Sequence, residues 1–570
     1  MTNLELYELW CQKATEDEDL IKELKSIKND ANAIKERFYA DLEFGTAGLR
    51  GVIGAGTIRM NIYTVRRATQ GLAEYLNEKY DNPSVAIAYD SRIKSDLFSK
   101  DVAAVLAANG IKVYLHEELE PTPVLSFTVR KLKTNAGIMI TASHNPAKYN
   151  GYKCYGSDGC QMTMNDANAV LNKIKNVDMF DGVKIMSFDE GIKSGKIEFI
   201  GEEILEKFYE KINDTLINPQ ILKETDLKVI YTPLNGTGNK PVREMLKRAG
   251  VKNVFVVKEQ ELPDGNFPTA PFPNPEIRQC FELAIKMAST INPDILIATD
   301  PDCDRIGIAV NVNGEYVLMT GNEVGVMILN YILSQKKEKG IMPSSPVAFK
   351  TIVTTELTTE VAKHYNCAMI DLLTGFKFIG EQIGLLEAEN KEDNYILGFE
   401  ESYGYLSGTH VRDKDAVNAA LVICDMAAFY KKQGKNLVEV MDEIYKKFGY
   451  YVNSGDEIIC EGSAGMQKIT NIMKSLRAEP LSSIADVKVT TISDYFTSKE
   501  KDIINNNINK ITLPQSDVIS YTLENGSKVI VRPSGTEPKI KIYYTTKGIT
   551  KADAKDKITK LKAAMAELID

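Results

Sequence analysis

The stretch SKDVAAVLAANG (residues 99–110), followed by IKVYLHEE (111–118), decides the fold class of this chain. Val105 and Leu106 lie three and four residues after Val102, which is the spacing of one face of an amphipathic helix. The glycine that ends the first run can adopt the left-handed conformation that closes such a helix. The apolar run after it has the character of a strand. The stretch therefore predicts a helix that leads directly into a strand of an α/β sheet.

Two further stretches repeat this pattern of amphipathic helix, break and apolar strand. They are KPVREMLKRAG (240–250) before VKNVFVV (251–257), and LTTEVAKHYN (357–366) before CAMIDLL (367–373). Units of this kind build parallel or mixed sheets that are covered by helices. The chain is therefore expected to contain three tandem, similar α/β domains with mixed sheets.

The C-terminal part shows a different pattern. SDVISYTLENGSKVIVRP (516–533) contains two strand-like runs joined at Asn525-Gly526, which is a strong signal for a β-hairpin. A strand-like run, IKIYYTTKG (540–548), and an amphipathic helix over 551–570 follow. The predicted fold class is therefore α/β, with three similar mixed-sheet domains and a C-terminal α+β domain around a central cleft.

The predicted domain boundaries lie near residues 205, 320 and 447, and the first ~40 residues are expected to form a helical extension. Within this extension, the acidic run from Glu16 to Asp19 predicts a solvated helix face. The four predicted domains are 1–205, 206–320, 321–447 and 448–570.

The composition narrows the possible classes of function. A net charge of −9 on 570 residues argues against a nucleic-acid binder or a membrane-surface binder, because both need a basic face. The chain starts without a secretory signal and has no apolar run of ~18 residues, so no membrane span is expected. Eight cysteines without a C-x-x-C pair indicate reduced thiols and a cytoplasmic location.

The first motif that could carry chemistry is TASHNP (141–146), directly after the apolar run AGIMI. α/β folds place reactive groups in loops that leave the C-terminal ends of strands, which makes Ser143 a candidate nucleophile. The alternative is a Ser/Asn turn without chemistry. His144 beside Ser143 does not indicate a hydrolase triad, because triad members meet in space rather than in sequence.

The second motif is DPDCDR (300–305), at the end of the apolar run DILIAT. Carboxylates at i, i+2 and i+4 of an extended loop project to the same side, where they repel one another unless a cation lies between them. Asp300, Asp302 and Asp304 therefore predict a site for Mg²⁺, and the neighbouring arginine could clamp a phosphate. The alternatives are a solvated acidic turn or the opening of a haloacid-dehalogenase phosphatase motif, which would want Thr or Val at position 304.

Two further loops contain hydrogen-bonding and charged groups that could bind a sugar phosphate. GFEESYG (398–404) presents carboxylates and a hydroxyl that could bind sugar hydroxyls, although an exposed acidic loop is an equal alternative. RPSGTEPK (532–539) combines an arginine, two hydroxyls and backbone N–H groups, as a phosphate cradle does, and its alternative is a basic hairpin turn.

In this order, the four loops resemble those of the α-D-phosphohexomutase family, and the resemblance extends from about residue 41 to about residue 545. The length and the GFEESYGYL form look most similar to the longer phosphoglucomutase/phosphopentomutase branch. The family pattern is also met by FGTAGLRG (44–51), NGYK (150–153), TGFK (374–377) and RDKD (412–415).

The resemblance implies a role for each matching residue. Ser143 would carry the phosphoryl group and, with Asp300, Asp302 and Asp304, would hold one Mg²⁺. The sugar hydroxyls would bind to Glu400 and Ser402, with Lys377 and Arg305 assisting in recognition. The phosphate that does not react would be held by Arg532, Ser534, Gly535 and Thr536. The four domains would be, in order, a phosphoserine domain, a metal-binding domain, a sugar-recognition domain and a phosphate-binding domain.

The implied reaction interconverts α-D-glucose 1-phosphate and glucose 6-phosphate through a glucose 1,6-bisphosphate intermediate. Lys414, Lys153 and Arg50 are the candidates for proton transfer. Part of the family has a histidine just after the sugar-loop serine, where this chain has Tyr403. His410 lies nearby in the sequence but is more simply a structural residue.

Mannose, glucosamine or pentose phosphates are alternative substrates, because a change at one carbon of the sugar alters only one or two hydrogen bonds. A catalytically weak sugar-phosphate-binding relative is the alternative from another class of function. The expected partners are small-molecule sugar phosphates, without nucleic acid or membrane, and the chain is expected to be a monomer or a dimer.

Overall fold

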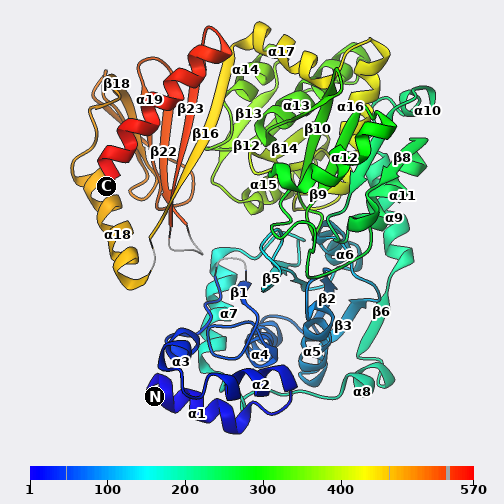
Figure 1. Ribbon diagram of the computed structural model, residues 1–570, viewed down its shortest axis with the longest axis vertical. Helices are drawn as coiled ribbons and strands as arrows, with labels where there is room; N and C mark the ends of the chain where they lie inside the picture. Colours follow the sequence, from blue (N-terminus) through cyan, green and yellow to red (C-terminus); the bar gives the residue numbers. More distant parts are fainter. Residues whose placement is uncertain (46–47, 461, 535–538, 570) are drawn as a thin grey trace. The chain divides into compact units, whose positions relative to one another are not determined.

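The computed structural model describes residues 1–45, 48–460, 462–534 and 539–569 (Figure 1). It divides into two compact units. Unit 1 comprises Met1–Met319, Ile379–Tyr395 and Tyr403–Asn436, and unit 2 comprises Thr320–Phe378, Ile396–Ser402 and Leu437–Asp570. The eight cysteines are free thiols, and seven of them are buried. Among the described residues, no helix has both the length and the apolar character needed to cross a membrane.

Unit 1 opens with the predicted helical extension: α1 (Asn3–Lys13), α2 (Glu18–Ser26) and α3 (Ala31–Phe38). The residue before each helix caps it, because its side chain accepts a hydrogen bond from a backbone N–H of the first turn. Trp10, the only tryptophan of the chain, is buried and packs edge-on against Phe38 and Tyr63. The extension therefore shares the hydrophobic core of the first domain.

The prediction for the acidic run was wrong in part. Glu16 lies before α2 and pairs with Arg66 at 2.7 Å, and Asp17 caps α2 and pairs with Lys94 at 2.6 Å. These two carboxylates attach the extension to the domain behind it instead of forming a solvated helix face. Glu18 and Asp19 lie in the helix and are exposed, as Glu16 is, and Asp19 also pairs with Lys94 at 3.1 Å.

The first sheet of unit 1 is mixed and has the strand order β1-β5-β4-β2-β3-β6. β5 runs antiparallel to β1 and β4, and the other pairs are parallel. Val85 and Ile87 of β2 face the core shared with α4, α5 and α7, whereas Ala86 and Ala88 face α6, so helices cover both faces. The elements are β1 (Gly48–Val52), α4 (Ile62–Lys79), β2 (Ser84–Tyr89), α5 (Ser95–Ala108), β3 (Lys112–His116), α6 (Thr122–Leu132), β4 (Ala136–Ile140), β5 (Tyr149–Gly156), α7 (Met164–Asn176), α8 (Phe188–Lys193) and β6 (Ile197–Ile200).

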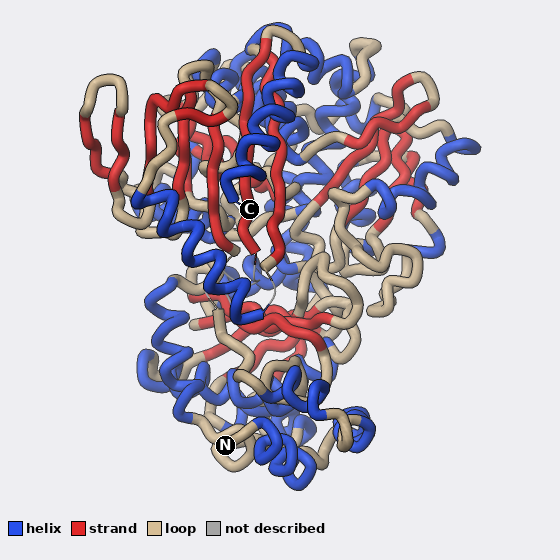
Figure 2. Tube along the Cα trace, turned by 60° about the vertical axis from the view of Figure 1, so that its left-hand side comes forward, coloured by secondary structure: helices blue, strands red, loops and turns tan. Residues whose placement is uncertain are grey.

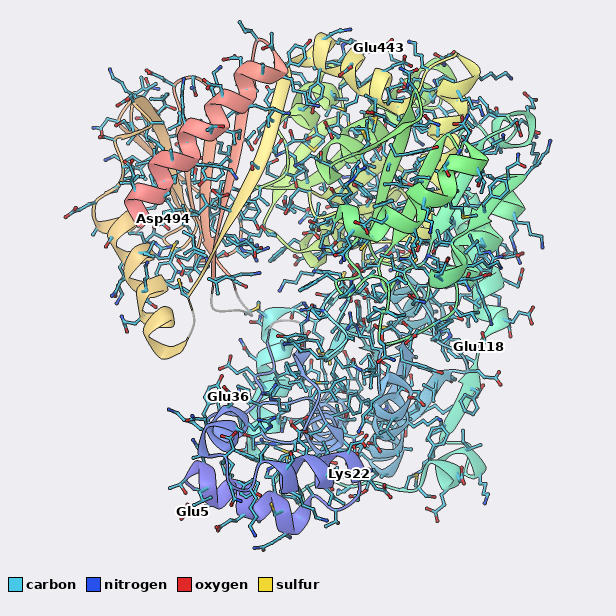
Figure 3. The ribbon with its side chains drawn as sticks, viewed as in Figure 1. Glu5, Lys22, Glu36, Glu118, Glu443 and Asp494 are labelled. Atoms are coloured by element: carbon cyan, nitrogen blue, oxygen red, sulfur yellow. The ribbon has the colours of Figure 1, made fainter. Side chains whose placement is uncertain are left out.

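The second sheet, also mixed, has the order β11-β10-β9-β7-β8. β8, β7 and β9 are parallel, and β10 and β11 continue the sheet antiparallel. The elements are α9 (Glu202–Asn213), α10 (Ile221–Glu224), β7 (Lys228–Thr232), α11 (Asn239–Ala249), β8 (Asn253–Val256), η1 (Lys258–Gln260), η2 (Arg278–Phe281), α12 (Glu282–Ile291), β9 (Ile295–Thr299), β10 (Ile306–Val312) and β11 (Glu315–Leu318). Lys240, at the start of α11, forms an ion pair with Glu118 of the first domain and so connects the two domains. Glu118 is labelled in Figure 3.

The third sheet contains β14, β12 and β13 in that order, with β12 and β13 parallel. Its elements are α13 (Gly321–Glu338), β12 (Val347–Thr351), α14 (Leu357–His364), β13 (Ala368–Leu372), α15 (Phe376–Ala388), η3 (Glu392–Asn394), β14 (Tyr395–Glu400), β15 (Gly404–Leu406), α16 (Ala416–Lys432) and α17 (Leu437–Phe448). The three predicted helix-to-strand units are confirmed as α5 with β3, α11 with β8, and α14 with β13.

The three sheets share one arrangement. The order β4-β2-β3 of the first sheet recurs as β9-β7-β8 in the second and as β14-β12-β13 in the third. The prediction of three similar domains is therefore confirmed. The first three motifs occupy equivalent positions, because TASHNP follows β4, DPDCDR follows β9, and GFEES spans the end of β14.

The fourth domain, in unit 2, contains an antiparallel sheet with the order β16-β23-β22-β21-β18-β19-β20. Its strands are among those drawn in red in Figure 2. Val529 and Val531 of β22 pack with α18 and α19, whereas Ile530 between them packs with Ile352 and Val353 of the third domain. The predicted hairpin is β21 and β22, with Gly526 at a φ of 79°. The elements are β16 (Tyr450–Ile459), α18 (Gly462–Ala478), β17 (Ser483–Ile484), β18 (Val487–Asp494), β19 (Lys499–Asp502), β20 (Asn507–Lys510), β21 (Ile519–Leu523), β22 (Lys528–Pro533), β23 (Lys539–Gly548) and α19 (Lys551–Ile569).

Candidate active site

Ser143 lies at the centre of a cluster of polar side chains in unit 1. It follows β4 and has a φ of 53°, a left-handed conformation that is unusual for a residue with a Cβ atom. Its backbone N–H donates to Thr141 Oγ1 at 2.8 Å, and its own Oγ donates to Asp300 Oδ2 at 2.8 Å. The His144 Nδ1 atom lies 3.2 Å from Ser143 Oγ. Burial, with Arg305 and Arg50 nearby, holds the pKa of His144 well below its ordinary value, so the ring is neutral.

The three predicted metal-ligating aspartates converge. Asp300, Asp302 and Asp304 are buried, and each offers one carboxylate oxygen within 4.8 Å of the others. The loop is not extended as predicted: it makes a tight turn with Cys303 at a φ of 51°, and the backbone N–H of Cys303 donates to Asp300 O. The convergence therefore comes from the turn and not from an alternation of side chains along an extended chain.

The oxygens of this cluster fit a divalent cation. Among the described residues, no hydrogen-bond donor serves Asp302 Oδ1 or Asp304 Oδ1, although both atoms are buried. A buried carboxylate oxygen without a donor is costly, and a hard cation with oxygen ligands would satisfy it. Burial, together with the charges of Asp302 and Asp304, raises the pKa of Asp300 well above its ordinary value, which a cation among the three would reverse.

Two predicted lysines lie beside the aspartates. Lys153 Nζ is 2.7 Å from Asp302 Oδ2 and 3.5 Å from Asp304 Oδ2. Lys414 Nζ is 3.1 Å from Asp304 Oδ2 and 2.9 Å from Oδ1 of Asp413. Burial acts against the charge of Lys153, but the two neighbouring aspartates outweigh it and raise the pKa of Lys153, which keeps it protonated.

The two predicted arginines of unit 1 approach the same region. Arg50, on the edge strand β1, donates to Asn145 Oδ1 in the serine loop at 3.1 Å. Arg305 donates to Glu276 Oε1 at 3.1 Å and has its Nε 3.8 Å from Asp304 Oδ1. His410, in contrast, is buried, pairs with Asp415 at 2.8 Å and packs against Phe208. This contact fits the structural role expected for His410, because Asp415 caps α16.

The sequence-based reasoning missed the side chains that hold the serine loop. Arg92 is buried, and its guanidinium donates to the backbone carbonyls of Ser143, Asn145, Pro146 and Tyr149. Asp90 accepts from Thr141 Oγ1 at 2.6 Å, and Thr141 in turn accepts from the N–H of Ser143. The available signal was the polar triplet Asp90-Ser91-Arg92 directly after an apolar strand, as in the other motifs.

Thr122 was also missed. Its backbone N–H donates to Asp302 O at 2.9 Å, and its hydroxyl donates to Asp302 Oδ2 at 2.7 Å. Thr122, which belongs to the first domain, therefore orients Asp302 in the DPDCDR loop of the second domain. The signal for Thr122 was its place between two prolines at a helix start, which the sequence alone does not connect with residue 302.

The sugar-loop residues lie in unit 2. The carboxylate of Glu400 is buried and accepts from the backbone N–H of Gly375 at 2.8 Å, which brings GFEES next to TGFK and its Lys377. Glu401 accepts from the hydroxyls of Thr351 and Thr354 at 3.1 Å each. Ser402 follows them and is partly buried.

The predicted phosphate loop starts at the end of β22, also in unit 2. Arg532 lies on β22, and the backbone N–H of Ser534 donates to Lys539 O at 2.8 Å, so the two ends of the loop meet. Gly535 and Thr536 lie outside the described residues.

Four family models match the chain. They are described as phosphoglucomutase/phosphomannomutase alpha/beta/alpha domains I, II and III and the C-terminal domain, and they match residues 41–180, 206–314, 320–448 and 477–567. The chain therefore belongs to the α-D-phosphohexomutase family, whose members are intramolecular phosphotransferases.

Individual relatives support this assignment. A phosphoglucomutase of Staphylococcus saprophyticus is 36% identical over 541 residues, covering 94% of this chain and 96% of that protein. A phosphoglucomutase of Staphylococcus aureus is 37% identical, covering 95% of each chain. Among solved structures, parafusin (phosphoglucomutase) of Paramecium, in its open form, has the same fold with a TM-score of 0.67 at 17% identity, covering 94% of this chain and 95% of that one.

Proposed function

We propose that this phosphohexomutase interconverts α-D-glucose 1-phosphate and glucose 6-phosphate by way of a phosphoryl group carried on Ser143. The observation that carries the proposal is the 2.8 Å contact between Ser143 Oγ and Asp300, beside two buried aspartate oxygens without donors. The preference for glucose is supported by the relatives named phosphoglucomutase, which are 36–37% identical over nearly the whole chain.

The first transfer moves the phosphoryl group from Ser143 to the C6 hydroxyl of glucose 1-phosphate. The bond between phosphorus and Ser143 Oγ breaks, a bond between phosphorus and the C6 oxygen forms, and the hydroxyl proton passes to a base of the protein. The product, glucose 1,6-bisphosphate, turns end for end. Its C1 phosphoryl group then returns to Ser143, the C1 oxygen regains a proton, and glucose 6-phosphate is released.

Lys414, Lys153 and Arg50 are the candidates that we propose for the proton transfer. Lys153 is held protonated by two aspartates, which suits a charge partner for phosphate better than a base. The guanidinium of Arg50 does not lose its proton in proteins, so it suits hydrogen bonding to a phosphate oxygen. Lys414 is flanked in the same way by Asp304 and Asp413, so its contacts do not favour it over Lys153 as the base.

Asp300, Asp302 and Asp304 would hold Mg²⁺ together with an oxygen on Ser143. When bound, the ion supplies positive charge that neutralises the transferring phosphoryl group, and phosphoryl transfer depends mainly on such charge and on positioning. Thr122 and Lys153 bind the second oxygen of Asp302 and so fix the direction of its first oxygen.

The remaining groups would bind the substrate. Glu400 and Ser402 would form hydrogen bonds with the C3 and C4 hydroxyls of the sugar. These two hydroxyls present nearly the same face in both orientations of the sugar. Lys377 and Arg305 would assist in recognition. The phosphate that does not react would be held by Arg532, Ser534, Gly535 and Thr536. Its binding free energy can orient the reacting hydroxyl at the other end of the sugar.

We also propose the four domains 1–205, 206–320, 321–447 and 448–570, a cytoplasmic location, and a monomer or dimer that binds sugar phosphates and no nucleic acid. Glucose 1,6-bisphosphate would serve as intermediate and activator.

The test is ³¹P NMR of α-glucose 1-phosphate with the protein, Mg²⁺ and trace glucose 1,6-bisphosphate. Conversion to glucose 6-phosphate without inorganic phosphate is expected, and Ser143→Ala should abolish it. Mannose 1-phosphate and ribose 1-phosphate in parallel samples rank the substrates by kcat/KM. Faster turnover of mannose 1-phosphate or ribose 1-phosphate would make that sugar phosphate the preferred substrate in place of glucose 1-phosphate. Release of inorganic phosphate would indicate a phosphatase, and unchanged substrates would indicate a binding protein.

A further inference from the structure

The helical extension lies outside the four ranges that match the family models, since the first of these begins at residue 41. It contacts the turn that follows β1, the strand that carries Arg50. We infer that the extension positions Arg50 for the phosphoryl transfer, and that Glu23 of α2 is the positioning residue. The inference deepens the proposed function and rests on the proposed role of Arg50.

The open side of β1 makes such a support necessary. β1 is the edge strand of the first sheet, and β5, where Arg50 lies opposite Gly151, is its partner strand. Among the described residues, the other backbone contacts of β1 are at its two ends, where Gly48 bridges to Gly45 and Val52 O accepts from the N–H of Met60. Arg50 is exposed and reaches Asn145 of the serine loop at 3.1 Å. An edge strand held on one side is free to shift, and a shift of β1 would displace the Arg50 guanidinium from this loop.

Glu23 binds the turn after β1 directly. Its Oε2 accepts a hydrogen bond from the backbone N–H of Ala55 at 2.7 Å, and its Oε1 accepts from Arg37 Nε of α3 at 2.9 Å. The Glu23 side chain is 28% exposed, so the contact is partly shielded from water. A carboxylate that accepts from a backbone N–H forms one of the stronger hydrogen bonds in proteins.

The turn is shaped to receive this carboxylate. A Cβ atom on Gly54 would lie 2.8 Å from Glu23 Oε2, and one on Gly56 would lie 2.5 Å from Arg37 O. Both glycines also have positive φ angles, 151° and 125°. A side chain at either position would push the turn away from the extension, so the close approach depends on both glycines.

Further contacts close the remaining side of the turn. The backbone N–H of Ile58 donates to Arg37 O at 3.3 Å, and the hydroxyl of Thr57 donates to Ala40 O at 2.6 Å. The N–H of Leu42 donates to Thr57 O at 2.8 Å. The extension therefore accepts hydrogen bonds from the turn at Ala55, Thr57 and Ile58, and among these contacts Glu23 is the one side-chain carboxylate.

The test is a double-mutant cycle between Glu23→Ala and Arg50→Ala, read out as kcat and KM of the mutase reaction. Glu23→Ala is expected to lower kcat by about ten- to a hundredfold with little change in KM, the size expected for a small misplacement of a catalytic group. In the Arg50→Ala background, the same substitution should lower kcat no further. Glu23→Gln, which keeps one acceptor oxygen for Ala55, should restore most of kcat.

The matched control is Glu36→Gln, an exposed carboxylate of α3 that Figure 3 labels, and it should leave kcat unchanged. A purely structural role would lower kcat by the same factor with and without Arg50, which would overturn the inference. Unchanged kcat in Glu23→Ala would overturn it equally.

Amide hydrogen exchange provides a readout without activity. Loss of the Glu23 carboxylate should speed exchange of the Ala55 N–H and of its neighbours in β1, while Trp10 fluorescence confirms that the core of unit 1 is intact. If the wild-type protein proves inactive as a mutase, the proposed function fails, but exchange still tests the contact. Unchanged exchange at Ala55 would overturn the inference whatever the substrate.

Discussion

Replacing Arg92 with methionine is expected to loosen the serine loop and to destabilise unit 1. The Arg92 side chain is fully buried, and its guanidinium donates to four backbone carbonyls of the segment from Ser143 to Tyr149. It also lies 3.3 Å from the buried carboxylate of Asp90 and over the ring of Phe267 at 5.0 Å. A lysine at this position could not make the same contacts, since the fork of an arginine is needed to reach several carbonyls at once.

The expected cost follows from what remains after the substitution. Removing one partner of a buried charge pair destabilises a protein by about 3–5 kcal/mol, because the other charge stays buried without compensation. Carbonyls that lose their donor add to this cost. The double variant Asp90→Asn/Arg92→Met leaves no unpaired carboxylate charge buried at residue 90. Its free energy of unfolding should therefore fall by less than the sum of the decreases in the two single variants.

The assay is urea unfolding followed by Trp10 fluorescence, which reports on unit 1 because the chain has no other tryptophan. Lys100→Met, an exposed charge of α5, is the matched control and should shift the midpoint little. Arg92→Met should also lower kcat by about a hundredfold, since Ser143 would no longer be held in place. A free energy of unfolding within about 1 kcal/mol of wild type, with normal kcat, would refute the reasoning.

Three further predictions concern single carboxylates. Asp302→Asn should weaken Mg²⁺ binding by more than about tenfold in isothermal titration, because even outer-shell changes commonly weaken metal binding that much; unchanged affinity would contradict the metal site. In unit 2, burial opposes the charge of Glu356, but Lys350 and Lys528 lower its pKa to about 2, below the unfolded value. Glu356 therefore stabilises the fold above pH ~4.5 by on the order of 3 kcal/mol, and this contribution is lost as the pH falls towards 2; Glu356→Gln should flatten that part of a plot of melting temperature against pH. Burial, with Glu118 nearby, raises the pKa of Glu120 to about 8, so Glu120 lowers stability progressively as the pH rises from ~4.5 to 8. Glu120→Gln should raise the melting temperature at pH 8 more than at pH 5, and equal shifts at both pH values would show that burial does not perturb Glu120.

The parts of the fold that depend on local pattern could be predicted from the sequence. Gly110 and Gly250 follow helices and have positive φ angles, and Asn525-Gly526 forms the expected hairpin turn. Hydrophobic spacing located each of the three helix-to-strand units, because one face of each element had to be buried. The order of strands within each sheet was not accessible, since it depends on pairing between segments far apart in the sequence.

The candidate site shows the same division. Ser143 and the three aspartates could be found because each motif directly follows an apolar strand. Arg92 and Thr122 were missed because their partners lie 51 to 57 and 180 residues away in the chain, and local patterns carry no such information.

The backbone of the motif loops was also not predictable. Ser143, Cys303 and Tyr403 all adopt left-handed conformations, with φ of 53°, 51° and 64°, at similar positions after β4, β9 and β14. None of the three is a glycine, so no sequence signal marked them. Such conformations cost free energy and persist only where surrounding contacts enforce them. Around Ser143, those contacts come from Arg92 and Thr141.

The central claim, that Ser143 carries the phosphoryl group, is tested most directly by mapping the site of phosphorylation. The protein is incubated with Mg²⁺ and glucose 1,6-bisphosphate, and its peptides are analysed by mass spectrometry. The account predicts one added phosphoryl group on the peptide that contains Ser143, its transfer to added glucose 1-phosphate, and its absence in Ser143→Ala. Phosphorylation at another residue, or full mutase turnover by Ser143→Ala, would contradict the account.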